Sequence, residues 1–219
     1  MKRGVKLIEG VGYNDADYTV QKYQKTNGKS IRIWTCPYYV RWIGMFRRCY
    51  SPAALKRNPN YADCSVCEQW LYFSNFKSWM ETQDWEGKEL DKDLLFSNNK
   101  VYGPNTCVFV TQDVNKFIID QERKRGGSPV GVSFEKETGK YKAQCYSVTT
   151  RKRKNLGRFT THEEAFSAYL KYKLEQAHIL AEKQSDTRVA KALIGRFTKM
   201  LDPFWNQEID LEYAQGDFQ

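Results

Sequence analysis

Carboxylates and amides gather between residues 87 and 117 at spacings that could bind a divalent cation. Asp91 and Asp93 fall in a predicted strand over residues 90–95, and Asn115 falls in a predicted helix that begins at Gln112. Carboxylate and amide oxygens suit hard cations such as Mg²⁺ or Mn²⁺. The segment therefore predicts a metal site made by Asp91, Asp93 and Asn115. The alternative is that the acids are surface residues and the asparagines only form turns.

The elements that must position these residues are two strands and a helix. A polar loop over residues 97–105, rich in Asn, Gly and Pro, separates the first strand from a second predicted strand over residues 106–111. The order strand, loop, strand, helix predicts a β-β-α unit. Such a unit would bring the carboxylate pair close to the amide on the helix.

This segment resembles the HNH nuclease family in the form that phage homing-type endonucleases carry, over residues 31–120. Thr106-Cys107-Val108-Phe109-Val110 stands where the family has its second strand, and Asn115 stands where a His or Asn completes the metal site. The resemblance implies metal-dependent cleavage or nicking of duplex DNA, with these candidates for catalysis: Asp91, Lys92, Asp93 and the loop asparagine Asn105. The family's general-base histidine is replaced here by Asp91-Lys92-Asp93, because the chain's only histidines are His162 and His178.

Residues 130–184 show a different pattern, with three strand-like runs (130–134, 141–148 and 155–159) followed by a helix over 160–183 that Thr161 caps. This stretch resembles the DNA-binding domain of plant ethylene-response factors. The matching points are Gly131-Val132, Gly139-Lys140-Tyr141, Ala143, Leu156-Gly157-Arg158-Phe159, Glu163-Glu164-Ala165 and Ala168-Tyr169. The resemblance implies a three-stranded sheet that lies in the major groove of DNA and is covered by one helix.

The groove-facing positions that this second resemblance implies are Ser133, Glu135, Lys140, Gln144, Tyr146, Arg153 and Asn155. Period-two alternation independently turns Lys142, Gln144 and Tyr146 outward, with Tyr141, Ala143 and Cys145 toward the helix. Ser133 and Glu135 occupy positions where the plant domains have base-reading arginines, so the plant target sequence does not transfer. The run Arg151-Lys152-Arg153-Lys154 is expected to contact phosphates; the alternative is a solvated hairpin tip.

Charge and composition favour a polyanionic partner. The 219 residues carry a formal net charge of +9 and a sequence pI of about 9.2. Residues 121–158 alone hold eleven Lys or Arg against three Glu. No apolar run is long enough to cross a bilayer, and the first residues lack the apolar core of a signal peptide. We therefore expect double-stranded DNA as partner, no membrane, and a cytoplasmic location, which is the host cytoplasm if a phage encodes the chain.

The first half of the chain predicts a helical core around the β-β-α unit. A helix is expected from Pro37, with Trp42, Met45, Phe46 and Cys49 on its apolar face. Arg41, Arg47 and Arg48 lie off that face, either solvated or contacting phosphate. After a loop over residues 51–63, Trp70, Phe73, Phe76, Trp79 and Met80 predict buried helical packing, with Ser74 as an N-cap.

Six cysteines raise the question of structural zinc. Cys64-Ser65-Val66-Cys67 has the spacing of half a zinc site, and Cys49 with Cys107 could supply the other half. Only one pair is close in sequence, and Cys107 falls inside an apolar strand, where a reduced cysteine behaves as a small hydrophobe. Zinc is therefore not expected.

The fold class that follows is α+β: an HNH-like β-β-α module with helices, then a three-stranded antiparallel sheet packed on one helix. The expected divisions are an arm (1–30), the HNH-like domain (31–120), a linker (121–129), the DNA-binding domain (130–184), and a helix (188–201) with an acidic tail (202–219). The favoured function is DNA binding with metal-dependent cleavage. The alternatives are a catalytically degenerate DNA-binding or regulatory protein, and an interaction protein that engages a protein partner through the tail.

Overall fold

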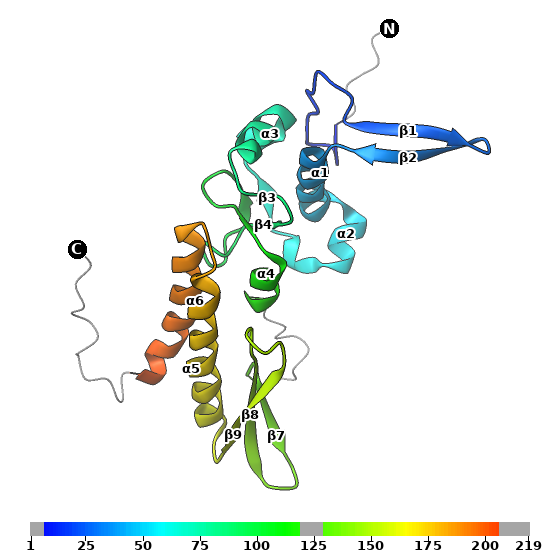
Figure 1. Ribbon diagram of the computed structural model, residues 1–219. Helices are drawn as coiled ribbons and strands as arrows, with labels where there is room; N and C mark the ends of the chain where they lie inside the picture. Colours follow the sequence, from blue (N-terminus) through cyan, green and yellow to red (C-terminus); the bar gives the residue numbers. More distant parts are fainter. Residues whose placement is uncertain (1–6, 119–128, 206–219) are drawn as a thin grey trace, which may run out of the picture. The chain divides into compact units, whose positions relative to one another are not determined.

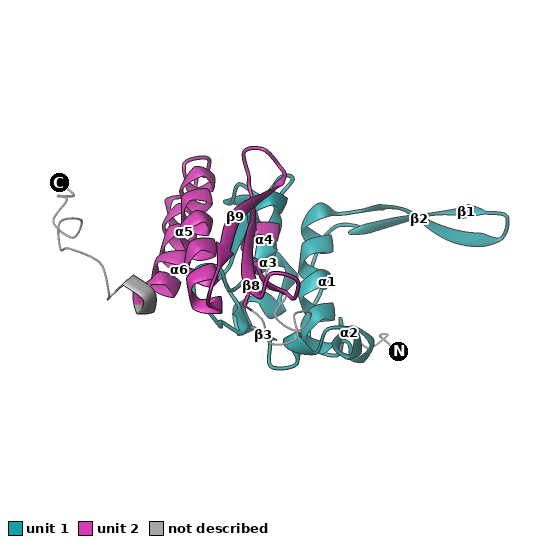
Figure 2. Ribbon diagram, turned by 90° about the horizontal axis from the view of Figure 1, so that it is seen from below, with its two compact units in different colours: residues 1–115 teal, residues 116–219 magenta. Residues whose placement is uncertain are grey.

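The computed structural model describes residues 7–118 and 129–205, with side chains as far as Asp202. The chain has a mixed α+β fold and divides into two compact units, residues 1–115 and 116–219, which Figure 2 colours separately. The expected linker and most of the acidic tail lie outside the described residues. Within the described part, no helix is both long enough and apolar enough to cross a membrane.

The first unit begins with a β-hairpin that the sequence did not predict. Strand β1 (Gln21–Thr26) pairs with β2 (Lys29–Thr35) in antiparallel register through a two-residue turn. Asn27 and Gly28 in that turn have φ of 51° and 74°, which is the left-handed conformation that a type I′ hairpin turn requires at both positions. The expected boundary of an arm at residue 30 falls inside this hairpin.

Helix α1 (Pro37–Tyr50) begins at the predicted proline and buries the predicted face. Trp42, Met45 and Phe46 are fully buried, and the Trp42 ring lies 5.5 Å from the Phe73 ring between centroids. Phe73 opens helix α3 (Phe73–Glu81), which buries Phe76 and Met80 in the same cluster. The predicted aromatic core is therefore confirmed.

Several local elements differ from the sequence prediction. The expected loop over residues 51–63 contains helix α2 (Pro52–Arg57) and the 3₁₀ turn η1 (Pro59–Tyr61). Ser74 is not an N-cap, because α3 begins one residue earlier and the Ser74 N–H and hydroxyl donate to the Asp15 carboxylate at 2.8 and 2.6 Å. Before α3 come β3 (Ser65–Val66) and the 3₁₀ turn η2 (Glu68–Leu71).

The β-β-α unit is present with shorter strands than expected. Strand β4 (Glu89–Asp91) pairs antiparallel with β6 (Val108–Val110), and α4 (Gln112–Ile118) begins at the predicted residue. The strand expected over residues 90–95 ends at Asp91, because one carboxylate oxygen of Asp91 accepts the N–H groups of Asp93 and Leu94 and turns the chain. The intervening loop contains β5 (Val101–Tyr102), which pairs in parallel with β3.

The second unit contains the predicted three-stranded antiparallel sheet. Its strands are β7 (Val132–Glu135), β8 (Lys140–Tyr146) and β9 (Arg153–Phe159), in that spatial order. Helix α5 (His162–Ala181) packs against all three strands (Figure 1). Its predicted cap is confirmed: the Thr161 hydroxyl accepts the Glu164 N–H, and the Glu164 carboxylate accepts the Thr161 N–H.

Helix α5 is itself packed against a second helix. Helix α6 (Thr187–Trp205) lies along α5 (Figure 1), and Leu201 joins a buried cluster with Cys145 of β8 and Leu170 of α5. Val189, Leu193 and Phe197 are buried, whereas Met200 is 38% exposed. The helix expected as a separate C-terminal segment is therefore part of the core of the second unit.

Candidate functional sites

The sheet of the second unit has one covered face and one open face. Ala143 and Cys145 of β8 are buried against α5, while Tyr146 is 48% exposed. The register places Ser133 beside Lys142 and Lys142 beside Arg158. The side chains of the open face are those of Ser133, Glu135, Lys140, Lys142, Gln144, Tyr146, Arg153, Asn155 and Arg158. The alternation predicted from the sequence is confirmed, and it brings together all but three of the predicted DNA-contacting residues.

Glu135 and Arg158 form the main ion pair on this open face. Arg158 donates to the Glu135 carboxylate at 2.5 and 3.2 Å, and the Lys142 ammonium lies 3.6 Å from it. The hydrogen bond from Arg158, with help from the charge of Lys142, holds the pKa of Glu135 below its usual value. Sequence analysis missed Arg158 as a surface residue of this site; the cross-strand register with Lys142 is the signal that could have found it.

The four cations at the hairpin end of the sheet do not share one face: these are Arg151, Lys152, Arg153 and Lys154. The turn closes when the Ser147 N–H donates to the Lys152 carbonyl at 2.9 Å, and it leaves Arg151 and Lys152 exposed. Arg153 lies opposite Tyr146 on the open face. Lys154 lies opposite the buried Cys145, and its ammonium sits 4.5 Å from the centre of the Tyr172 ring of α5. Lys154 therefore belongs to the helix side of the sheet.

The first unit contains a cavity of about 580 Å³ where basic and acidic side chains meet. Its basic side is formed by Arg32, Arg41, Arg47 and Arg48, and its acidic side by Glu89, Asp91 and Asp93, with Lys92 and Asn115 beside them. The arginines of α1 that the sequence placed off the apolar face thus face the predicted metal-binding segment. Two of them have internal partners: Arg41 donates to the Lys88 carbonyl and Arg48 to the Tyr102 hydroxyl.

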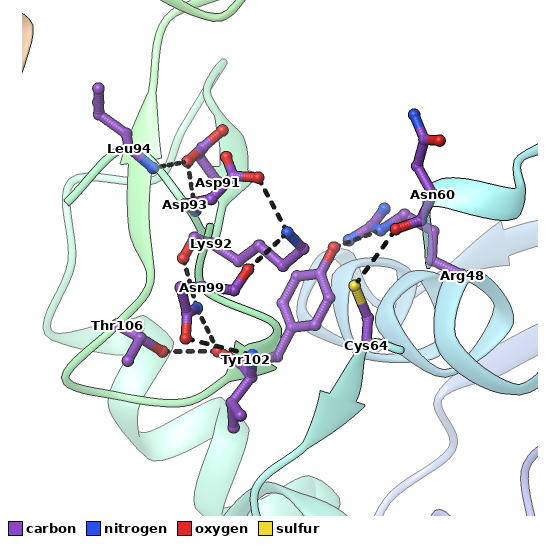
Figure 3. Close-up of polar contacts among 11 residues, drawn as sticks. Arg48, Asn60, Cys64, Asp91, Lys92, Asp93, Leu94, Asn99, Tyr102 and Thr106 are labelled. Atoms are coloured by element: carbon purple, nitrogen blue, oxygen red, sulfur yellow. Dashed lines mark hydrogen bonds and ion pairs between the residues drawn. The ribbon is translucent and has the colours of Figure 1, made fainter. Parts of the chain in front are cut away.

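The surroundings of Asp91 disfavour its charged form. One of its oxygens accepts the N–H groups of Asp93 and Leu94 at 2.9 and 2.7 Å (Figure 3). Burial, and next the negative charge of Asp93, outweigh these hydrogen bonds, so the pKa of Asp91 is raised above its usual value. A cation bound in the cavity would stabilise the charged form of Asp91 and so lower its pKa.

Lys92 lies just beyond the end of β4. The chain turns after Asp91, and the Lys92 side chain runs inward to donate to the Asp93 carboxylate and to the Asn99 carbonyl, each at 2.9 Å (Figure 3). Lys92 is only 8% exposed. Burial lowers its pKa, but the hydrogen bond and charge of Asp93 outweigh that effect, and the pKa of Lys92 is raised. These two acceptors hold the Lys92 ammonium in place beside Asp93.

The loop asparagines serve different purposes from those expected. Asn99 organises the loop: its side-chain amide donates to the carbonyls of Lys92 and Val101 at 2.6 and 2.7 Å. Asn105, a candidate for catalysis by resemblance, is exposed in the turn before β6 and does not border the cavity. The structure thus brings Asp91, Lys92 and Asp93 together and leaves Asn105 outside.

Glu89 is a cavity residue that sequence analysis missed. The amide group of Asn115 on α4 donates to the Glu89 carboxylate, so the two side chains lie against each other. Glu89 precedes Asp91 by two positions on β4, and that period-two spacing is the signal that could have indicated it. Within residues 7–118 and 129–205, no group of three or more His, Cys, Asp or Glu is arranged to hold a metal. Glu89, Asp91 and Asn115 still fit Mg²⁺, which needs only one or two carboxylates when water and phosphate oxygens complete its shell.

The cysteines considered for zinc have surroundings that favour the protonated thiol. Cys49, Cys64 and Cys107 are buried. Burial raises the pKa of Cys49 and of Cys107 to about 12 in each case, whereas zinc binds the thiolate. The absence of zinc stays a prediction.

Comparisons of the chain with models of protein families, with curated proteins and with solved structures find no match.

Proposed function

We propose that the protein binds double-stranded DNA through the open face of β7, β8 and β9. The observation that carries this proposal is the division of the sheet, with α5 on one face and Lys140, Lys142 and Arg153 on the uncovered one. Cations spread along adjacent strands suit the phosphate backbone, which supplies much of the affinity of DNA-binding proteins. The net charge of +9 supports the same class of partner.

The centre of this face carries groups that suit base edges. Gln144 and Asn155 are direct cross-strand neighbours, and amide side chains pair with adenine in the major groove. Two hydrogen bonds to the Glu135 carboxylate hold the Arg158 guanidinium in one orientation. Sequence preference would come from these central residues, and affinity from the cations around them.

The test compares two adjacent cations of β9. Arg153→Ala removes a charge from the open face, and Lys154→Ala removes one from the helix side, so the second variant is a matched control. Binding of the full chain to a labelled duplex is measured by anisotropy across a salt series. We expect Arg153→Ala to reduce the slope of log K against log salt by about 0.9, and Lys154→Ala to leave it unchanged. Equal slopes for all three proteins would contradict this mode of binding.

A second candidate function is metal-dependent cleavage or nicking of DNA in the cavity of the first unit. The observation that favours it is that Glu89, Asp91 and Asn115 share one cavity with four arginines. The arginines would bind a phosphate, and Glu89, Asp91 and Asn115 would hold the divalent cation. A bound Mg²⁺ or Mn²⁺ would supply charge stabilisation for the leaving oxygen. The resemblance to phage homing-type endonucleases agrees with this candidate, and the catalytically degenerate alternative is its rival.

Incubation with supercoiled plasmid separates the two alternatives. Nicking that requires Mg²⁺ or Mn²⁺, disappears in Asp91→Asn and persists in Asp63→Asn would support cleavage, because Asp63 is exposed and away from the cavity. DNA binding by Asp91→Asn should stay intact. If the wild type leaves the plasmid supercoiled with either metal across a pH series, the cleavage candidate is wrong and DNA binding alone stands.

A further inference from the structure

The hairpin of β1 and β2 extends away from the rest of the first unit (Figure 1). Every residue from Lys22 to Trp34 is exposed, including Tyr23, Ile31, Ile33 and Trp34 at 41–58%. A two-stranded ribbon with both faces in water is marginal on its own, since it has no core of its own to bury. Its base is nevertheless tied to the unit, where the Cys36 N–H donates to the Val20 carbonyl at 2.8 Å.

The hairpin is uniformly basic. Residues 21–35 include Lys22, Lys25, Lys29 and Arg32 and contain no Asp or Glu. The charged neighbours of its exposed aromatic and aliphatic side chains are therefore all positive. This composition suits a polyanion with flat apolar groups, which is the chemistry of a nucleic acid, better than it suits a general protein partner.

The register sorts these side chains onto two different faces. Lys22 lies opposite Trp34, Tyr23 opposite Arg32, and Lys25 opposite Ser30, with a bulge between Lys22 and Tyr23. The Lys22 ammonium lies 5.5 Å from the centre of the Trp34 ring, which agrees with their sharing a face. The extra residue at the bulge is Ile33 on β2, so β1 keeps its alternation and Lys22 lies on the face opposite Tyr23. We call the face of Tyr23, Lys25 and Arg32 the basic face. The other face carries Lys22, Gln24, Lys29, Ile31 and Trp34.

The basic face leads into the cavity of the first unit. Arg32 belongs to both, because it pairs with Tyr23 on the hairpin and also borders the cavity with Arg41 and Arg47 of α1. Thr35, the last residue of β2, borders the cavity as well. A line of cations therefore runs from Lys25 near the hairpin turn to the arginines opposite Asp91.

We propose that this hairpin is a second DNA-contacting element: its basic face follows the phosphate backbone of the duplex strand that reaches the cavity. A two-stranded ribbon has the dimensions to enter the major groove, and its lysines would reach the phosphates that border the groove. The inference rests on the proposed function for the identity of the ligand, but it involves residues in a different unit from the open sheet face.

The experiment compares two lysines on either side of the hairpin turn. Lys25→Ala removes a charge from the basic face and Lys29→Ala removes one from the opposite face, with equal change in net charge. Anisotropy with a mixed-sequence duplex and the full chain is measured across a salt series. We expect Lys25→Ala to lower the slope of log K against log salt by about 0.9, Lys25→Ala with Arg32→Ala to lower it by about twice as much, and Lys29→Ala to leave it unchanged.

A second variant tests the uncharged contacts. Tyr23→Ala should weaken binding several-fold and leave the slope unchanged, because it removes an apolar contact from the basic face and no charge. Thermal unfolding of each variant should match the wild type, since all these side chains are exposed.

Failure of the inference and failure of the proposed function give different results. If the wild type binds and Arg153→Ala reduces the slope but Lys25→Ala and Lys29→Ala behave alike, the hairpin does not follow the backbone and the sheet proposal stands. If the wild type shows no salt-sensitive binding, both are wrong. A dimer that Ile31→Thr with Ile33→Thr dissociates, without change of slope in Lys25→Ala, would identify the hairpin as a self-association element and overturn the inference.

Discussion

Arg158 on β9 donates two hydrogen bonds to Glu135 on β7, across the intervening strand β8. Both side chains lie on the open face of the sheet, so the carboxylate lies among the cations that we propose to contact DNA. It therefore both orients Arg158 and opposes the approach of phosphate.

We expect Glu135→Gln to raise affinity for mixed-sequence DNA several-fold at neutral pH, because it removes a negative charge from the surface and releases Arg158. Discrimination between sequences should fall, since Arg158 loses its fixed orientation. Anisotropy titrations with a set of single-base-pair variants of the duplex measure both effects. Glu137→Gln, an exposed acid in the turn between β7 and β8, is the charge-matched control.

The ionised Asp91 side chain should lower the free energy of unfolding. Its pKa is raised in the folded state, so the folded protein binds more protons than the unfolded chain between the two pKa values. Stability due to this group therefore falls as pH rises from the unfolded value of 3.8 through the folded value, and the cost is fully present above it. We expect Asp91→Asn to be more stable than the wild type at pH 7, and the difference to shrink as pH falls through the folded value and to be smallest below about pH 4. Urea unfolding at both pH values is the measurement; a wild type that is the more stable at pH 7 would contradict it.

The buried Lys92 should stabilise the loop between β4 and β5. Lys92→Met removes its hydrogen bonds to Asp93 and to the Asn99 carbonyl and should cost about 1–3 kcal/mol. The pKa of Lys92 is raised by folding, so this contribution is fully present below the ordinary value of 10.5 and is lost as pH rises through the folded value. The difference in unfolding free energy between wild type and Lys92→Met should therefore stay constant to about pH 10 and then decrease. A constant difference up to pH 12 would show that packing alone is responsible.

Gly131 is required by both its backbone and its neighbours. Its φ is +75°, and a Cβ there would lie 2.1 Å from the Tyr169 ring and 2.7 Å from the Gln144 carbonyl. We expect Gly131→Ala to destabilise the protein by about 3 kcal/mol or more. Gly139, with φ of +62° and open space around it, is the matched control, and Gly139→Ala should cost only about 1 kcal/mol. Thermal or urea unfolding gives both values, and equal losses would refute the steric argument.

The cap of α5 offers a test in the element that supports the open sheet. Thr161→Ala removes the oxygen that accepts the Glu164 N–H and should cost about 1 kcal/mol. Thr160→Ala changes an exposed neighbour outside the cap position and should cost less than half as much. Since neither residue lies on the open face, DNA affinity at a temperature well below unfolding should be unchanged in both variants.

Sequence alone determined the features that depend on residues close together in the chain. Alternation in residues 140–146 identified which side chains lie on the open face of the sheet. Thr161 with Glu164 identified the start of α5. The spacing of Trp42, Met45 and Phe46 identified the buried face of α1. In each case neighbours within a few positions set the outcome, because strand and helix periods are local properties of the backbone.

Tertiary structure decided what depends on residues far apart in the chain. Lys92 is buried with its ammonium 5.8 Å from the centre of the Tyr61 ring, thirty-one positions earlier in the chain. Arg158 meets Glu135, and Arg32 meets the arginines of α1, only through strand register and packing. A buried charge is stable only where distant groups solvate it, and no local pattern specifies which groups those are.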